Sequence, residues 1–266
     1  MKKAAKVAVV GMGLIGGSFE KAALRAGYAV NSLHHGDASG FEDAEIILVC
    51  LPPSAVVPWI LEHSSSFKKG AVVIDIAGVK RSILDGIAAA FPSGTGDWRF
   101  IGGHPMAGKE VAGYANSSAD LFNGASMILV LKECETVDSS VRDFFLSLGF
   151  SRVVITTAER HDQMISFTSQ LCHLISSAYV RDELACFHEG FSAGSFRDMA
   201  RVGAPDPGMW TELFIQNRDM LMPVLERYIS RLEDFRSSLA AGDRERMKTA
   251  LAEGVAAKAV FGKEVE

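Results

Sequence analysis

Short apolar runs, rich in Val and Ile and bounded by Gly, Pro or charged residues, recur through the first half of the chain. They cover residues 7–10, 45–51, 71–76, 100–103 and 127–131. Runs of this length and composition predict strands that are buried on both faces. Amphipathic stretches that predict helices lie between them, at residues 17–26, 56–64 and 81–90. This alternation predicts a doubly wound α/β domain with a mostly parallel sheet.

The spacing of apolar residues changes after residue 157. Apolar side chains there recur every three or four positions, at Met164, Phe167, Leu171, Leu174 and Ala178 and again at Leu221, Val224, Leu225, Tyr228, Leu232 and Phe235. Because this spacing is typical of amphipathic helices, we expect an all-helical second half. The predicted domains are residues 1–155 and 156–266, joined directly near residues 152–157. We also expect Pro223 to kink a long helix and Asp243 to cap the next one.

Charge and hydropathy limit the possible partners. The 266 residues carry a formal net charge of −5, with 32 Asp and Glu against 27 Lys and Arg, and no basic run exceeds two residues. This balance gives no electrostatic basis for binding nucleic acid. No uncharged apolar stretch approaches the ~18 residues that a membrane span needs. We therefore expect neither nucleic acid nor a membrane among the partners.

The four cysteines, Cys50, Cys134, Cys172 and Cys186, form no Cys-x-x-Cys pair. Their spacing matches neither a zinc site nor an extracellular disulfide framework. We expect reduced thiols that lie mostly in the core, no metal site, and a cytoplasmic location.

A glycine-rich loop follows the first predicted strand and precedes the first predicted helix. Its glycines, Gly11, Gly13 and Gly16, have the G-x-G-x-x-G spacing of a dinucleotide-binding loop. Gly11 would make the tight turn, Gly13 would let the backbone approach a pyrophosphate, and Gly16 would let the helix pack closely on the strand. The loop predicts a Rossmann-type domain that binds NAD or NADP.

Other residues are expected beside the same cofactor. Leu14 and Ile15 occupy the first turn of the helix, whose N-terminus would hold the pyrophosphate. Leu51 ends one of the next predicted strands, and Pro52 and Gly78 follow such strands, at the edge of the sheet where dinucleotides bind. We therefore assign all five residues to the cofactor site.

The end of the second strand leaves the choice of cofactor open. An acidic residue that binds the ribose 2′-hydroxyl is expected there, but the chain has His34 and His35, and Asp37 comes late. His34 could bond a ribose hydroxyl or, when protonated, a 2′-phosphate, so both NAD and NADP fit. Alternatively, the two histidines are exposed loop residues. About ten residues separate His34 from the next predicted strand, too few for the usual intervening helix.

A histidine stands at the carboxyl end of another predicted strand, in the segment from Gly103 through His104 and Pro105 to Gly108. Ligands bind in the crevice outside such strand ends. The ordinary pKa of histidine, about 6.5, suits a group that takes a proton at neutral pH. His104 is therefore the candidate catalytic base, with a strand-capping histidine as the alternative.

At this segment the chain resembles prephenate and arogenate dehydrogenases of tyrosine biosynthesis. The resemblance covers nearly the whole chain and rests on the glycine loop and on residues 75–80, 104–108, 160–162, 169–173 and 195–201. It implies NAD(P)-dependent oxidative decarboxylation of prephenate to 4-hydroxyphenylpyruvate by a homodimer that pairs through its helical half. Arogenate dehydrogenase or a cyclohexadienyl dehydrogenase with dual specificity is the alternative within the family.

The resemblance also implies roles for individual residues. His104 would accept the proton of the substrate hydroxyl, and Arg201 would bind the ring carboxylate in a bidentate manner. We expect the neighbouring Arg197 to be structural. Ser169 and His173 are four residues apart, so both would face one side of a helix that lines the substrate pocket. His173 as a core histidine is the alternative.

Lys109 and Glu110 follow the His104 segment and are expected at the pocket mouth. A carboxylate there would favour the ammonium group of arogenate over the keto group of prephenate, and Lys109 would partly cancel that effect. The choice between prephenate and arogenate therefore stays open. If Lys109 and Glu110 are only surface residues, they give no information about the substrate.

One position departs from the family pattern. Family members commonly have a serine at the position of Gly78, where its hydroxyl bonds both the catalytic histidine and the substrate hydroxyl. We expect a water or a neighbouring group to orient His104 instead. Lys80 is expected to be solvated or helix-capping, and Asp75 to hold a turn.

Two other functions compete with the dehydrogenase. One is a short-chain β-hydroxyacid or imine reductase, although such enzymes more often use a helical lysine. The other is a non-catalytic dinucleotide-sensing protein, for which the glycine at position 78 is the only hint.

Overall fold

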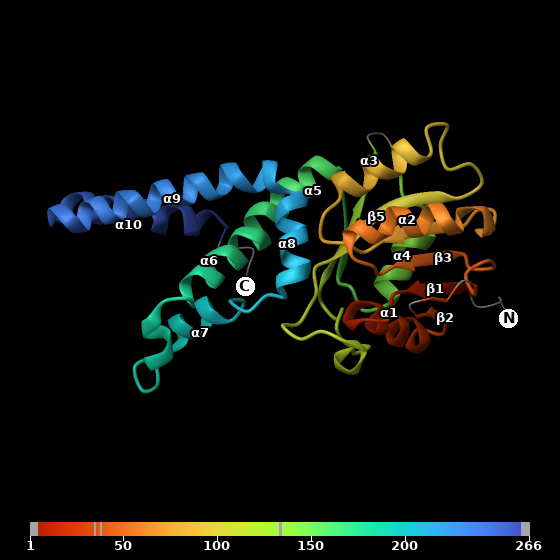
Figure 1. Cartoon of the computed structure of the whole chain (residues 1–266), viewed down its shortest axis with the longest axis horizontal. Helices are drawn as coiled ribbons and strands as arrows, with labels where there is room; N and C mark the ends of the chain where they lie inside the picture. The colour runs from red at the N-terminus through yellow and green to blue at the C-terminus, as the bar shows by residue number, and fades with distance from the viewer. Residues whose placement is uncertain (1–4, 35, 38, 133–134, 262–266) are drawn as a thin grey trace. The chain divides into compact units, whose positions relative to one another are not determined.

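The computed structural model describes residues 5–34, 36–37, 39–132 and 135–261. The chain forms two compact units, Met1–Arg218 and Asp219–Glu266. The first unit is built on a seven-stranded sheet (Figure 1) in the order β2-β1-β3-β4-β5-β6-β7. His35 and Cys134, which were considered above, lie outside the described residues.

Five consecutive strands of this sheet are parallel. They are β1 (Lys6–Val10), β2 (Ala29–Leu33), β3 (Ile46–Val49), β4 (Val72–Asp75) and β5 (Arg99–Pro105). β6 (Ser126–Val130) runs antiparallel to β5, and β7 (Arg152–Thr156) runs parallel to β6. The predicted fold class, a mostly parallel α/β sheet followed by helices, is confirmed. In the described parts of residues 34–45 no helix separates β2 from β3, as the short spacing there predicted.

Helices cover both faces of the sheet because alternate residues of each strand point to opposite sides. On one face, Val9 and Leu48 pack with Phe19 of α1 (Leu14–Arg25) and Phe145 of α4 (Ser139–Ser147). On the other face, residues such as Ile47 and Val73 pack with α2 (Pro53–His63) and α3 (Arg81–Ala90). These two cores hold the carboxyl ends of β1, β3, β4 and β5 in one row.

Two elements of the first unit were not predicted. Helix α4 was missed, and β7 fell in the segment that was taken as the junction between domains. β7 is an edge strand, and Ile155 in it is 51% exposed. It therefore lacks the doubly buried apolar pattern that reveals the central strands.

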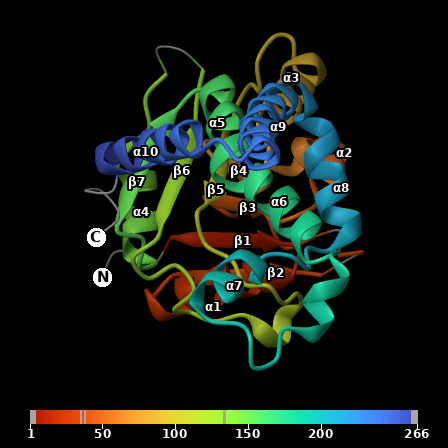
Figure 2. The same ribbon diagram turned by 90° about the vertical axis from the view of Figure 1, so that its left-hand side faces the viewer.

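Helices follow the sheet in the same unit, on the side where the parallel strands end, and Figure 2 views them from that side. They are α5 (Ala158–Ile165), a π-helical turn (Ser166–Leu171), α6 (Cys172–Tyr179), α7 (Gly194–Ala200) and α8 (Pro207–Gln216). The face buried by α5 and the π-helical turn is largely polar and includes His161, Asp162, Ser166 and Gln170. The helices predicted from the apolar spacing are present, but their apolar series is only partly buried. Leu171 is 3% exposed, whereas Met164 and Phe167 are 40% and 59% exposed.

The prediction that the cysteines lie mostly in the core is also wrong. Cys50 is half-buried, whereas Cys172 and Cys186 are exposed.

The second unit is a pair of helices formed by most of α9 (Arg218–Ala241) and by α10 (Arg244–Phe261). α9 continues through Pro223. The predicted cap at Asp243 is confirmed, because its carboxylate accepts a hydrogen bond from the amide of Arg246 at 3.0 Å. Among the described residues, no helix is long and apolar enough to cross a membrane. The predicted domain boundary at residues 155–156 stays a prediction.

Candidate active site

The glycine loop has the geometry of a ligand-binding turn. Gly11 has a φ of +90°, and a Cβ there would overlap the carbonyl oxygen of Cys50. A Cβ on Gly16 would overlap the carbonyl oxygen of Gly11, so these two glycines are required by packing. Gly13 differs, since a Cβ there would meet no described atom within 4 Å. The second glycine therefore faces open space, where a phosphate group could approach.

The N-terminus of α1 provides a second feature that suits an anion. Its N-cap is Gly13, no side chain caps it, and no acidic residue occupies the first turn. The first-turn amides beside Leu14 and Ile15 are thus available to a phosphate. These observations fit the dinucleotide expected from the sequence.

The other predicted cofactor residues lie at the same edge of the sheet. Leu51 and Pro52 follow β3, where Pro52 is the N-cap of α2, and Gly78 follows β4. His34 follows β2 and is exposed, and its amide donates to the Asp37 carboxylate at 2.7 Å. Asp37 therefore closes its own turn. The assignment of these residues to the cofactor stays a prediction.

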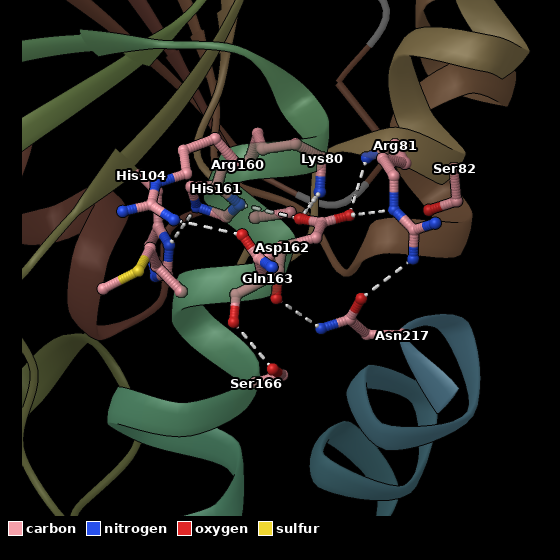
Figure 3. A network of polar contacts seen from close by, with 12 residues as sticks. Lys80, Arg81, Ser82, His104, Arg160, His161, Asp162, Gln163, Ser166 and Asn217 are labelled. Atoms are coloured by element: carbon pink, nitrogen blue, oxygen red, sulfur yellow. Dashed lines mark hydrogen bonds and ion pairs between the residues drawn. The ribbon is translucent and has the colours of Figure 1, made fainter. Parts of the chain in front are cut away.

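His104 lies near the end of β5 and is bonded to a second histidine (Figure 3). Its Nδ1 is 2.9 Å from Nε2 of His161 in α5, and the ring centroids are 5.1 Å apart. Burial, reinforced by His161 and Lys80, holds the pKa of His104 well below 6.5. The ring is therefore neutral at neutral pH, with a lower pKa than the ordinary value assumed from the sequence.

His161 is 2% exposed and is bonded at its other nitrogen, where Nδ1 lies 2.7 Å from Oδ1 of Asp162. Asp162 also accepts from the amides of Lys80, at 2.9 Å, and Arg81, at 3.0 Å. These are the first amides of α3, whose N-cap has no side-chain cap of its own. Asp162 thus caps α3 from α5 and fixes the helices to the sheet at this point.

Arg81 and Asn217 complete this network (Figure 3). Nε of Arg81 donates to Oδ2 of Asp162 at 3.2 Å, and its Nη2 donates to Oδ1 of Asn217 at 3.1 Å. Asn217 in turn donates to the Asp162 carbonyl at 3.0 Å and to the Gln170 side chain at 2.8 Å. The buried polar face of α5 and the π-helical turn is explained by these bonds.

Lys80 also connects this network to a fully buried ion pair, which its ammonium forms with Asp75. Both side chains are 0% exposed. The expectation that Lys80 is solvated or helix-capping is wrong. Gly102 leaves room for its stem, because a Cβ there would lie 3.0 Å from Cδ of Lys80. Asp75 also holds its turn, accepting from the Ala77 amide at 3.1 Å. Burial raises the pKa of Asp75 and lowers that of Lys80, and their attraction opposes both shifts.

The predicted substrate residues form a second group. Nη1 of Arg201 lies 2.6 Å from Oε1 of Glu110, and both side chains are exposed. His173 is half-buried, with Nδ1 3.1 Å from the Val202 carbonyl and its ring centroid 3.6 Å from that of Trp210. A hydrogen bond from its own amide and then the Arg201 bond lower the pKa of Glu110, while burial lowers that of His173.

Within the described part of the chain, the side chains of three other residues considered above form no hydrogen bond or ion pair with this second group. Ser169 lies in the π-helical turn and is half-buried. Nζ of Lys109 donates to the Asn116 carbonyl at 3.0 Å, so this side chain is held within its own loop. Arg197 is exposed and forms no ion pair with a described residue, so the structural role expected for it stays a prediction.

Helix α8 connects the two groups. A Cβ on Gly78 would lie 3.2 Å from the side chain of Leu213 and 3.9 Å from Cε1 of His104. Trp210, three residues before Leu213 and so on the same side of the helix, contacts His173. One face of α8 therefore lies against Gly78, which is next to His104, and also contacts His173.

Comparison with known proteins identifies the family. The family model of the prephenate dehydrogenase nucleotide-binding domain matches residues 2–149, and that of the prephenate dehydrogenase dimerization domain matches residues 157–253. The chain belongs to the prephenate dehydrogenase family. Its relatives include a cyclohexadienyl dehydrogenase of Zymomonas mobilis, 28% identical over 76% of this chain and 70% of that protein. Prephenate dehydrogenase of Bacillus subtilis is 25% identical over 79% of this chain.

The chain spans 57% of that Bacillus protein and 60% of the prephenate dehydrogenase of Lactococcus lactis. Solved structures with the same fold include Synechocystis arogenate dehydrogenase, with a TM-score of 0.77, 24% identity and coverage of 96% and 99% of the two chains. Another is Aquifex aeolicus prephenate dehydrogenase in complex with hydroxyphenyl propionate and NAD+, with a TM-score of 0.79, 22% identity and 98% coverage of each chain.

Sequence reasoning missed three residues that the structure places beside the candidate site: His161, Asp162 and Trp210. Arg160, His161 and Asp162 supported the family resemblance, but no role was assigned to His161 or Asp162. Trp210 was likewise assigned no role at the site. The one available signal was the adjacent pair His161 and Asp162 near the start of a predicted helix. This pair alone does not reveal that His161 contacts His104, 57 residues away.

Proposed function

We propose that this chain is an NAD(P)-dependent prephenate dehydrogenase that converts prephenate to 4-hydroxyphenylpyruvate in tyrosine biosynthesis. The observation that carries the proposal is the position of α8. It lies against Gly78, next to the neutral His104, and it also contacts His173 in the group that contains Arg201. A proton acceptor and a carboxylate-binding cation beside one dinucleotide site are the groups that this oxidation needs.

The chain's own residues have separate tasks in this proposal. Gly13 and the first turn of α1 bind the pyrophosphate of the cofactor, which, when bound, supplies the hydride acceptor. His104 takes the proton of the C4 hydroxyl at Nε2 as the carbonyl forms. The ring carboxylate is then lost as carbon dioxide, and the ring becomes aromatic.

Arg201 is the proposed anchor of the ring carboxylate. It already binds one carboxylate, that of Glu110, which supports this role. The substrate carboxylate would share Arg201 with Glu110 or displace it. His173 and Ser169 are proposed to contact the substrate side chain, and Lys109 with Glu110 to border the entrance.

A second candidate substrate, arogenate, is favoured by two observations. Glu110 is ionised beside Arg201, and His173 uses Nδ1 toward the Val202 carbonyl, which leaves Nε2 as an acceptor. A carboxylate and a bare ring nitrogen both suit an ammonium group. A cyclohexadienyl dehydrogenase that accepts both substrates is thus the alternative.

The direct test is a comparison of rates on both substrates with both cofactors. The purified chain is incubated with prephenate or arogenate and with NAD or NADP, and reduced nicotinamide is followed by absorbance. Reduction of the nicotinamide with at least one combination is expected. A β-hydroxyacid is included as a further substrate, and nicotinamide reduction with it alone would favour the reductase. Retained dinucleotide binding without nicotinamide reduction in any combination would favour the non-catalytic sensor.

We further propose that the chain works as a cytoplasmic homodimer. Met164, Phe167 and Ile215 of the first unit are exposed, as are Leu251 and Val255 of the second. Large apolar side chains gathered on helices suit an interface, and the match to a dimerization domain supports this use. Light scattering on the purified chain should give twice the monomer mass, and a monomer at micromolar concentration would contradict the dimer.

A further inference from the structure

We propose that His161, held by Asp162, is the positioning residue of the catalytic base: it fixes the proton of His104 on Nδ1 and leaves Nε2 bare. The effect on rate rests on the proposed function, whereas the position of the proton does not. The proposal follows from tracing which atom donates in each bond, beginning at the carboxylate.

Asp162 can only accept in this network. Its oxygens face the Lys80 and Arg81 amides and the Arg81 guanidinium, all of which are donors. Burial opposes ionisation of Asp162, but its bond to His161 and these amide bonds together hold its pKa below the usual value. An ionised Asp162 has no proton to give, so Nδ1 of His161 must donate to it.

The direction of the next bond follows from the charge of His161. Burial lowers its pKa, with the Lys80 ammonium acting in the same direction against the bond to Asp162. A neutral imidazole that carries its proton on Nδ1 has a bare Nε2. At 2.9 Å, this Nε2 accepts from Nδ1 of His104. His104 is neutral for the same reasons, so its own Nε2 is bare and can receive a substrate proton.

The opposite arrangement would be inactive. If His161 were protonated, both of its nitrogens would donate, and Nδ1 of His104 would have to accept. The remaining proton of a neutral His104 would then sit on Nε2, where the substrate proton has to go. Asp162 and His161 therefore select the reactive tautomer, which is the task that a side chain at Gly78 does not perform here.

The same two bonds provide a path for the positive charge. When Nε2 of His104 gains a proton, the proton on its Nδ1 can pass to Nε2 of His161. One proton enters the pair and none leaves it, while the charge moves next to the Asp162 carboxylate. The pair thus titrates as a unit. The positively charged end of α3, which Asp162 caps, holds this carboxylate in place.

The first experiment measures the tautomers directly in the unmodified protein. The chain is labelled with ¹⁵N-histidine, and the nitrogen shifts and proton couplings of His104 and His161 are assigned at pH 7.5. Both rings are expected to carry the proton on Nδ1 with a bare Nε2. A proton on Nε2 of His104 would overturn the proposal. Because this measurement needs no turnover, it remains decisive if prephenate is not the substrate.

The second experiment separates positioning from mere structure by three variants. His161→Ala should lower kcat by about 100-fold with little change in the KM for the cofactor, and should shift the acidic limb of the pH–rate profile. His161→Gln should restore most of the rate, because its amide oxygen can accept from Nδ1 of His104. His188→Ala, at an exposed histidine, is the matched control and should be unchanged. Equal rates for the Ala and Gln variants, or an unchanged kcat in His161→Ala, would contradict the proposal.

Discussion

Nδ1 of His104 lies 2.9 Å from Nε2 of His161, although the two residues are 57 positions apart in the sequence. One histidine ends a strand of the parallel sheet, and the other begins the helical half. Asp162, next to His161, caps α3 and so fixes that helical half to the sheet. The candidate base is therefore assembled from both halves of the chain.

The glycine loop gives a test that separates cofactor binding from folding. Gly13→Ala should fold normally, because no described atom lies within 4 Å of the added Cβ. Its affinity for the dinucleotide should fall by about 10-fold or more, since a methyl group would occupy the path of the pyrophosphate. Calorimetric titration and thermal unfolding measure the two effects.

Gly16→Ala is the matched comparison within the same loop. Its Cβ would overlap the Gly11 carbonyl oxygen, so the melting temperature should fall along with cofactor affinity. If Gly13→Ala instead bound the dinucleotide as well as the unmodified chain, the assignment of this loop to the pyrophosphate would be wrong.

Arg201 and Arg197 lie on the same segment but should respond differently to substitution. Arg201→Ala removes the proposed anchor of the ring carboxylate, and kcat/KM should drop by about 10- to 100-fold, in line with the loss of a charged hydrogen bond. Arg197→Ala should stay within about twofold, because this exposed side chain has no ion-pair partner among the described residues. Steady-state kinetics on prephenate measure both, and the reverse order would exchange the roles of the two arginines.

The buried pair beneath the histidines should matter for stability. Lys80→Met leaves the Asp75 carboxylate buried without its cation, which should lower the free energy of unfolding by about 3–5 kcal/mol. The double variant Asp75→Asn, Lys80→Met should recover part of this loss, because no charge is then buried. Urea denaturation of the unmodified chain, the single variant and the double variant compares their free energies of unfolding. If Lys80→Met were as stable as the unmodified chain, the ion pair would be contradicted.

Stability should also depend on pH below neutrality. The pKa values of His104 and His161 are lowered in the folded chain, so the unfolded chain binds protons more readily as the pH falls through about 6.5. The stability present above that pH is therefore lost progressively as the pH falls from about 6.5 toward the folded-state pKa values. Melting temperatures should decrease between pH 7.5 and 5.5, and less so in His161→Gln. A higher melting temperature at pH 5.5 would contradict neutral, buried histidines.

Much of the first half could be predicted because its signals are local. Doubly buried strands leave apolar runs. The spacing of the glycine loop is also a local signal, because Gly16 packs on the carbonyl oxygen of Gly11, although Gly11 itself packs on the distant Cys50. Edge strand β7 lacks this signal because Ile155 and its neighbours remain exposed. The segment Ser166–Leu171 was predicted only as part of a helix. The apolar spacing used there includes the exposed Phe167, whereas the polar Ser166 and Gln170 are buried together with Leu171.

The site could be predicted only where one residue implied its own chemistry. His104 stands at a strand end, and that position pointed to its role. The burial of Lys80 depends on Asp75 and on the space left by Gly102, which belongs to another strand. The contact between His104 and His161 depends on how α5 docks against the sheet. Such long-range contacts leave no pattern in a single sequence.

The most direct test of the account is the substitution His104→Asn. Asparagine keeps a polar side chain but cannot take up the substrate proton, so turnover should fall on the order of 10²-fold or more, while the Kd for the dinucleotide stays within about twofold of the unmodified chain. Stopped-flow rates of nicotinamide reduction and calorimetric titration with the cofactor give both values. Turnover close to that of the unmodified chain, or an equal loss of cofactor binding and rate, would contradict His104 as the base.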